Sequence, residues 1–269
     1  MTSSPALSTS DFERMATVFD RYLPLIEPVG RAVLDHLPEL ADHASVLDVA
    51  CGTGEPGLTL ARRAPTVRLL GVDGAPAMIE VARVKAAREG LGQARFEVMA
   101  AEHLACDDHT FDAVISRFGL LMFGDTLACA RELRRVLRVG GAFSLAVWDD
   151  MSTNLLVGAV IAAMRPFVPG ELIAPFETMP GAFAGERLRE VGWTDAQTVP
   201  FHWHYQFPDG EALWEFVSGP GIFSRQFAAL EERDKPRMHA QVCEALDAHR
   251  QADGSYRIPH VCRLWWGRR

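Results

Sequence analysis

Three closely spaced glycines carry the clearest chemical signal in this chain. Gly52, Gly54 and Gly57 form the pattern G-x-G-x-x-G directly after an apolar run at residues 45–49. A strand, a tight glycine turn and a helix start let the backbone approach a bound nucleotide closely. Asp48 stands four residues before Gly52, and a carboxylate there repels a pyrophosphate but attracts a cation. The loop therefore fits S-adenosylmethionine (SAM), which carries an ammonium and a sulfonium and no phosphate.

A second carboxylate, Asp73, closes the apolar run 67–72 and lies 19 residues after Gly54. At this spacing an acidic residue accepts hydrogen bonds from both ribose hydroxyls of a bound nucleotide. The alternative is a helix N-cap, because Asp73 precedes the helix expected at residues 76–88. A nicotinamide-dependent enzyme would share Asp73, but it would not explain Asp48.

Methyl transfer from a sulfonium needs a general base when the acceptor must lose a proton. His202 and His204 alternate along an expected strand, so they share one face while Trp203 takes the other. One of them serves as base if that face looks into the ligand cleft. The alternative, a solvated edge strand, is favoured by the usual exposure of histidine. Further candidates are His103, which is better placed near the adenine, His260 and Asp149.

Aromatic side chains are expected to form a pocket for the acceptor, although ordinary core packing is the alternative for each one. The set comprises Phe19, Tyr22, Phe118, Met122 and Trp148, and in the later segment Phe176, Trp203, Trp214, Phe223 and Phe227. We expect Tyr22 to pack on the cofactor and to direct its hydroxyl at the acceptor, unless its helix only covers the outer face of the sheet. The acceptor is then a small, largely apolar molecule.

Strand and helix patterns alternate in the first half of the chain, which predicts a mostly parallel sheet with helices on both faces. The expected strands are residues 46–50, 67–72, 94–99, 111–116, 142–148, 195–207 and 256–266. The expected helices are 11–22 and 25–37 (broken at Pro24), 55–63, 76–88, 126–137 (ending at Gly140-Gly141), 152–167, 182–191, 210–217 and 223–249. Residues 168–181 are rich in proline and glycine and are expected to be irregular.

The pattern predicts an α/β, Rossmann-like fold with a seven-stranded sheet, an antiparallel last strand and a helical cap. We expect one domain over residues 1–269. Residues 45–148 form its SAM-binding core, and residues 1–40 and 150–250 contribute the cap and the acceptor pocket.

Composition excludes several other classes of protein. The chain has 269 residues, 48% hydrophobic and 23% charged, as is ordinary for a globular enzyme. Its net charge of −8 argues against a nucleic-acid partner, and no apolar run approaches the roughly 18 residues that span a bilayer. The five cysteines form no C-x-x-C pair, which disfavours a metal site and a disulfide framework. Residues 1–10 lack the features of a secretory signal, so we expect a cytoplasmic protein, and the oligomeric state, including a homo-oligomer, is left open.

Five segments together resemble the class I SAM-dependent methyltransferases, in particular the ubiquinone/menaquinone-biosynthesis-like (methyltransferase type 11) family. They are VLDVACGTG (46–54), GVDGAPAMIEVAR (71–83), AAEHL (100–104), FDAVISRFGLLMF (111–123) and LRRVLRVGGAF (133–143). They occur in the family's order over residues 45–148.

The resemblance implies roles for residues around the cofactor. Gly52, Thr53 and Gly54 would wrap its methionine and ribose, together with Asp48. Asp73, with Gly74 beside it, would hold the ribose, and Met78 would pack near the adenine. Ala101 and Glu102 would border the adenine edge, and Ser116 and Arg117 would offer backbone carbonyls to the ammonium. Where many members carry Asp, this chain has Ala100, so adenine recognition should rest on backbone groups.

Two other functions remain open from the sequence. One is an NAD(P)-dependent oxidoreductase that uses the same glycine loop, against which Asp48 and the AAEHL segment speak. The other is a protein of this fold that keeps the cofactor as a scaffold, such as a cyclase or a binding module, since its cofactor loops would look identical.

Overall fold

The computed structural model describes residues 9–119, 125–148, 154–177, 188–193 and 195–269, with only the backbone for residues 175–177. Asp149, Met122 and the side chain of Phe176, which the sequence suggested for the base and the pocket, lie outside this set. Most of the helix expected at 182–191 lies outside it as well.

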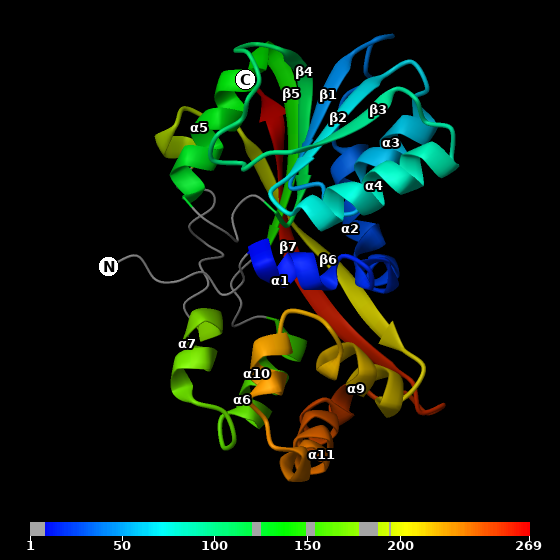
Figure 1. The fold of residues 1–269 in the computed structure, drawn as a ribbon, viewed down its shortest axis with the longest axis vertical. Helices are drawn as coiled ribbons and strands as arrows, with labels where there is room; N and C mark the ends of the chain where they lie inside the picture. Colours follow the sequence, from blue (N-terminus) through cyan, green and yellow to red (C-terminus); the bar gives the residue numbers. More distant parts are fainter. Residues whose placement is uncertain (1–8, 120–124, 149–153, 178–187, 194) are drawn as a thin grey trace.

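The centre of the molecule is one seven-stranded sheet (Figure 1). In chain order the strands are β1 (Ser45–Val49), β2 (Arg68–Asp73), β3 (Ala94–Val98), β4 (Phe111–Arg117), β5 (Leu137–Trp148), β6 (Gln197–Phe207) and β7 (Tyr256–Arg268). They lie in the order β3-β2-β1-β4-β5-β7-β6, and β7 runs antiparallel to both β5 and β6. This confirms the predicted mostly parallel sheet with an antiparallel last strand.

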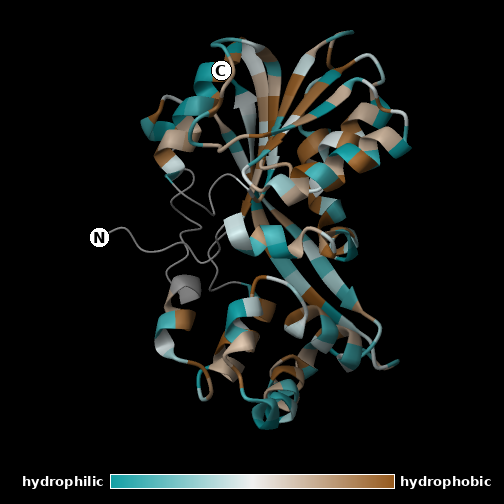
Figure 2. Cartoon of the chain, viewed as in Figure 1, coloured by the Kyte–Doolittle hydropathy of each residue, from teal (hydrophilic) through white to brown (hydrophobic). Residues whose placement is uncertain are grey.

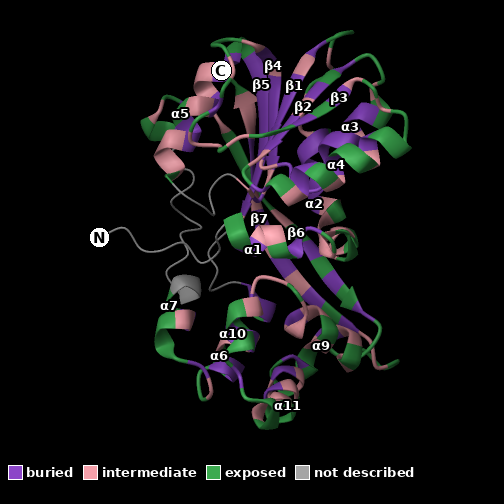
Figure 3. Ribbon diagram, viewed as in Figure 1, coloured by how far each residue is buried: buried purple, intermediate pink, exposed green. Residues whose placement is uncertain are grey.

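Helices cover both faces of this sheet, as predicted. On one face lie α2 (Leu23–Asp35), α3 (Gly57–Arg63) and α4 (Pro76–Arg88), and on the other lies α5 (Thr126–Val136). The central strands are mostly hydrophobic in Figure 2 and buried in Figure 3, as strands covered on both faces must be. The order of the strands reverses between β1 and β4, and ligands of open α/β sheets bind at the carboxyl ends of the strands there.

The cap is a group of helices around the extended ends of β6 and β7, at the bottom of Figure 1. It contains α6 (Leu155–Met164), α7 (Gly170–Glu177), α9 (Gly210–Ser218), α10 (Ser224–Ala228), α11 (Lys235–Ala245) and the short turns η3 (Glu232–Asp234) and η4 (Asp247–His249). The N-terminal α1 (Thr9–Met15) and η1 (Phe19–Arg21) lie between the cap and the carboxyl edge of the sheet.

Several predicted boundaries were wrong, each for a local reason. Pro24 does not break a helix but sits in the first turn of α2, where its missing N–H costs nothing. Gly140 and Gly141 do not cap α5, because the chain passes at Leu137 directly into β5, where Leu137 pairs with Phe111 of β4. The long helix expected at 223–249 is divided, since Pro236 begins the new helix α11. The helix α7 lies within the segment expected to be irregular.

Candidate active site

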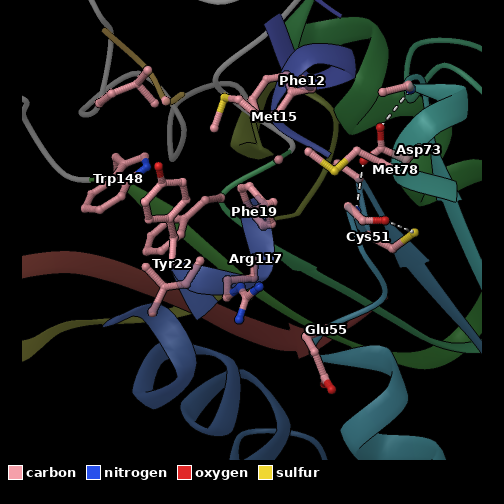
Figure 4. A pocket seen from close by; sticks show the side chains of 18 of the residues that line it. Phe12, Met15, Phe19, Tyr22, Cys51, Glu55, Asp73, Met78, Arg117 and Trp148 are labelled. Atoms are coloured by element: carbon pink, nitrogen blue, oxygen red, sulfur yellow. Dashed lines mark hydrogen bonds between the residues drawn. The ribbon is translucent and has the colours of Figure 1, made fainter. Parts of the chain in front are cut away.

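A cavity of about 490 Å³ lies at the carboxyl ends of β1, β2 and β4 and continues under the cap (Figure 4). One end is lined by the glycine loop after β1 and by residues that follow β2 and β3. The other end is lined by aromatic residues from the turn before α2, from β5 and β6, and from the cap. Both ends belong to one continuous space, whose volume is typical of a site for small ligands.

The glycine loop exposes its backbone to this cavity at Gly52. Gly52 has φ of +54°, a left-handed conformation that disfavours other residues. A Cβ placed there would meet only Phe19 Cε1, at 3.8 Å, so the space beside Gly52 is open to a ligand. The Gly52 N–H donates to Asp73 Oδ2 at 2.9 Å, which ties the loop to the end of β2.

Asp73 lines the cavity and organises the backbone around it. Its Oδ2 accepts from Gly52, and its Oδ1 accepts from the Ala75 N–H at 2.9 Å. Burial raises the pKa of this carboxyl. The N-cap residue of α4 is Ala75, so the alternative reading of Asp73 as the cap of that helix is wrong. Each carboxylate oxygen has a second lone pair, which leaves acceptor capacity for a ligand hydroxyl.

Asp48 does not line the cavity, contrary to the predicted attraction of the cofactor's cation. It is fully buried beneath the loop, where its Oδ2 accepts from the Gly57 N–H at 3.0 Å. A Cβ on Gly57 would lie 2.7 Å from Oδ2, so the third glycine lets the carboxyl reach the loop. Oδ1 has no hydrogen-bond partner among the described residues, and burial raises the pKa of this carboxyl to about 8. Asp48 therefore supports the glycine loop from the buried side, away from the cavity.

Thr53, Gly54 and Ser116 also lie behind the cavity wall. Thr53 Oγ1 donates to Asp20 Oδ1 at 2.6 Å, and Ser116 Oγ donates to the Val49 carbonyl at 2.7 Å. A Cβ on Gly54 would lie 2.7 Å from Leu58 Cδ1. None of the three residues is among those that line the cavity, so their direct contact with the cofactor stays a prediction.

The remaining predicted cofactor residues do line the cavity. They are Gly74, Met78, Ala101, Glu102 and Arg117. Met78 is buried at the start of α4, and Ala101 and Glu102 follow β3 in a turn, with Ala100 beside them. All of them except Arg117 lie at the end of the cavity that follows β2 and β3.

The other end of the cavity is largely aromatic. Phe118 and Trp148 stack with ring centroids 4.1 Å apart and an angle of 8° between the rings. Tyr22 meets Phe216 edge to face at 5.1 Å, and its hydroxyl donates to the Pro220 carbonyl at 2.8 Å. Of the aromatic residues predicted here, Phe19, Tyr22, Phe118, Trp148 and Phe223 line the cavity, whereas Trp203, Trp214 and Phe227 pack around it.

The prediction that His202 or His204 serves as the base is wrong. His202 and His204 are both exposed on β6, while Trp203 and Tyr205 between and beyond them are buried. The shared face of the two histidines is therefore the solvated one, on a strand at the edge of the sheet. This was the stated alternative, and it removes both residues as candidate bases. His103 is likewise exposed in a loop.

His260 on β7 is the histidine that lines the cavity. Its ring stacks on Tyr205 with centroids 3.7 Å apart, and its Nδ1 lies 3.1 Å from the Ile258 carbonyl. That contact fits a tautomer in which Nδ1 carries the proton, which leaves Nε2 as an acceptor. Nε2 is buried with no hydrogen-bond partner among the described residues, and burial lowers the pKa of the ring to about 4.

The N-terminal helix α1 lies along one side of the cavity, within the segment 1–40 that the sequence assigned to the cap and the acceptor pocket. Phe12 and Met15 face the cavity. The Glu13 carboxylate accepts from the Ala77 N–H of α4 at 3.3 Å, and Asp11 pairs with Arg225 of α10 at 2.9 Å. One short helix thus contacts both the sheet half and the cap. Asn154 and Tyr205 also line the cavity and were not singled out from the sequence.

Comparison with known proteins identifies the part of the chain around the glycine loop. Residues 46–141 match a family described as a methyltransferase domain. A demethylmenaquinone methyltransferase of Deinococcus radiodurans is 41% identical over 115 residues, which are 43% of this chain and 47% of that relative. The match therefore spans about half the length of this curated relative.

Solved structures extend the likeness in fold to most of the chain. The YcgJ protein of Bacillus subtilis covers 90% of this chain and 99% of its own, with a TM-score of 0.58 and 19% identity. A putative methyltransferase from an antibiotic biosynthesis pathway of Anabaena variabilis covers 89% of this chain and 96% of its own, with a TM-score of 0.65 and 17% identity. At these identities the likeness shows the fold alone.

Over residues 46–141 the chain therefore resembles the core of the class I SAM-dependent methyltransferases of the ubiquinone/menaquinone type, as its motifs predicted. The cofactor of this class is SAM. No helix in the part of the chain that the structure describes has both the length and the apolarity to cross a membrane.

Proposed function

We propose that this protein transfers a methyl group from SAM to a small, largely apolar molecule by in-line displacement. The observation that carries the proposal is the continuity of the cavity. Backbone groups and Asp73 at one end and aromatic rings at the other line the same cavity.

The residues of the first end fit the cofactor. In our proposal Asp73 accepts from the ribose hydroxyls, Gly52 gives its open backbone to the ribose and methionine, and Met78 packs on the adenine. Ala101 and Glu102 meet the adenine edge. When bound, the cofactor supplies an activated methyl group on a sulfonium. Gly74 lies beside Asp73, where a Cβ would meet only Thr9 Oγ1 at 3.9 Å, so there is room for the ribose.

The protein's own contribution is to position and enclose the acceptor. Holding the two reactants in line can supply up to roughly 7–11 kcal/mol of the barrier in favourable cases. Phe118 and Trp148 form a flat wall that suits a planar acceptor, and Phe12 and Phe19 exclude water from the cofactor side. Tyr22 belongs to this enclosure, since its hydroxyl proton is already donated to Pro220.

The identity of the acceptor does not follow from the relatives' names. The residues that line the aromatic end include Trp148, Tyr205, Phe216 and His260, which all lie outside the matched segment 46–141. Where the acceptor must lose a proton, we propose His260 as the base in place of His202 and His204. We retain the cytoplasm as the expected location, since all five cysteines are free thiols.

The test is transfer of label from SAM carrying a radioactive methyl group to a metabolite extract. The proposal expects one labelled, organic-extractable product that is absent with heat-inactivated protein. Binding of S-adenosylhomocysteine (SAH) without any label transfer would instead support the use of the cofactor as a scaffold. Absence of SAH binding would overturn the proposed function.

A further inference from the structure

Arg117 presents a half-buried cation to the cavity. It is the last residue of β4, and it is the one lysine or arginine among the described residues that line the cavity. No hydrogen bond or ion pair is formed by its guanidinium within the described part of the chain. Figure 4 shows it below Phe19, between Tyr22 and Glu55.

Its acidic neighbours are occupied elsewhere. Glu55 accepts from the Thr59 N–H at 3.0 Å and pairs with Arg62 at 2.9 Å. Glu27 pairs with Arg31 at 2.9 Å. Asp48 accepts from the Gly57 N–H, and no hydrogen bond or ion pair joins it to Arg117; burial raises the pKa of its carboxyl to about 8, although the charge of Arg117 acts in the opposite direction.

The helix α2 lies against the guanidinium. A Cβ added to Gly30 of α2 would lie 3.1 Å from Arg117 Nη1, so α2 packs closely on one side of it. Burial lowers the pKa of Arg117, yet a guanidinium keeps its proton in proteins. A half-buried charge with no hydrogen-bonded counterion is costly, and an anion brought by a ligand would lower that cost.

We propose that the Arg117 guanidinium is an anion subsite of the cavity, which takes a carboxylate of a bound ligand. The inference rests on the proposed function and goes beyond the backbone role expected for this residue. The planar fork of the guanidinium matches a carboxylate through two parallel hydrogen bonds. Two ligands can bring that group, namely the amino-acid end of the cofactor and an acidic acceptor.

The first arm of the test compares two cofactor fragments by calorimetry. SAH carries the α-carboxylate, whereas 5′-methylthioadenosine has the same nucleoside and lacks the amino acid. In Arg117→Gln we expect SAH affinity to fall about 10–100-fold, the range for hydrogen bonds to charged groups, and methylthioadenosine affinity to change less than about 3-fold. Arg117→Lys keeps the charge but not the planar fork, so it should lose less SAH affinity than Arg117→Gln. Arg31→Gln removes a cation from the exposed side of α2 and should change neither affinity.

The second arm uses the protein saturated with SAH. Binding of 2-naphthoate and of uncharged 2-naphthylmethanol is measured by ligand-detected NMR in the unaltered protein and in Arg117→Gln. A selective loss of naphthoate binding, with SAH binding intact, assigns the subsite to an acidic acceptor. A selective loss of SAH over methylthioadenosine assigns it to the cofactor.

Either selective loss supports the anion subsite. Equal losses for charged and uncharged ligands show that Arg117 has only a structural role, and they overturn the inference, as do unchanged affinities in both arms. Failure of the unaltered protein to bind SAH overturns the proposed function and this inference together. SAH binding that survives Arg117→Gln, with no effect on naphthoate, overturns the inference alone.

Discussion

The two ends of the cavity are built in different ways. The cofactor end is made by short connections after three neighbouring strands, and its backbone groups are fixed by Asp73. The aromatic end is assembled from Tyr22, Trp148, Tyr205 and His260, which are far apart in the sequence. The family match covers the first end and stops before most of the second. In the proposed function, one sheet edge therefore supplies a fixed nucleotide site, while residues from distant parts of the chain supply the acceptor pocket.

The largest expected effect is loss of the cofactor end through Gly52→Val. The new side chain would fill the open space beside Gly52 and strain a left-handed backbone. We expect SAH affinity measured by calorimetry to fall at least about 100-fold, or roughly 2.7 kcal/mol.

Gly90→Val is the matched control for this change. Gly90 has φ of +68°, and a Cβ there meets nothing within 4 Å, so the strain is similar but the cavity is untouched. If both variants bound SAH equally well, the glycine loop would not be the cofactor site.

Asp73→Ala should cost about 1.5–3 kcal/mol of SAH affinity, the scale for hydrogen bonds to a charged acceptor. Asp125→Ala is its control, since Asp125 also accepts from two backbone N–H groups, of Leu127 and Ala128, away from the cavity. A loss below about 0.3 kcal/mol in calorimetry would mean that Asp73 only organises backbone.

The low polarity of the aromatic end should appear in how the stability contributed by His260 depends on pH. The folded pKa is about 4 and the unfolded value about 6.5, so the unfolded chain binds more protons between these values. The stability that neutral His260 contributes is present at pH 7 and is lost as the pH falls through 6.5 toward 4. The expected contribution is about 2 kcal/mol between pH 7 and pH 5.

Urea unfolding of the unaltered protein and of His260→Asn at both pH values measures this contribution. The variant should lose less stability on acidification, by about the stated amount. His202→Asn changes an exposed histidine and should keep the slope of the unaltered protein. Identical slopes in all three would show that the aromatic end is open to water.

Trp148→Ala should impair the aromatic end of the cavity and leave the cofactor end intact. It removes one wall of the acceptor end, so single-turnover methyl transfer per folded molecule should fall about 10-fold through poorer positioning. SAH affinity should stay unchanged. Trp214→Ala alters a cap tryptophan that packs on Phe227 and His239 outside the cavity, and it should lower the melting temperature without this loss of turnover.

The smallest effect is expected for Tyr22→Phe. It removes the bond to the Pro220 carbonyl and should cost about 0.5–1 kcal/mol of unfolding free energy. Methyl transfer should change little, because the enclosing ring remains. A large drop in single-turnover rate with unchanged stability would restore the hydroxyl to a catalytic role.

The sequence could predict which residues gather at one end of the cavity because these residues are local. Gly52 and Asp73 stand at fixed distances from strand ends, and strand ends meet at one edge of a parallel sheet. Burial was not available from the sequence, which is why Asp48 was expected at the ligand. The pattern on β6 gave the alternation of His202 and Trp203 correctly. It could not say which face points inward, since that depends on how β7 and the cap pack.

The helix α1 has a consequence for how fast ligands exchange. It is fastened to the sheet half by Glu13 at the first turn of α4 and to the cap by the ion pair of Asp11 with Arg225. A ligand that enters or leaves the cavity past α1 must break both contacts, and each contact involves a charged side chain. Added salt weakens such contacts where they are exposed. Ionic strength should therefore change the residence time of the products. It would act through α1, a helix of seven residues that takes no part in the chemistry.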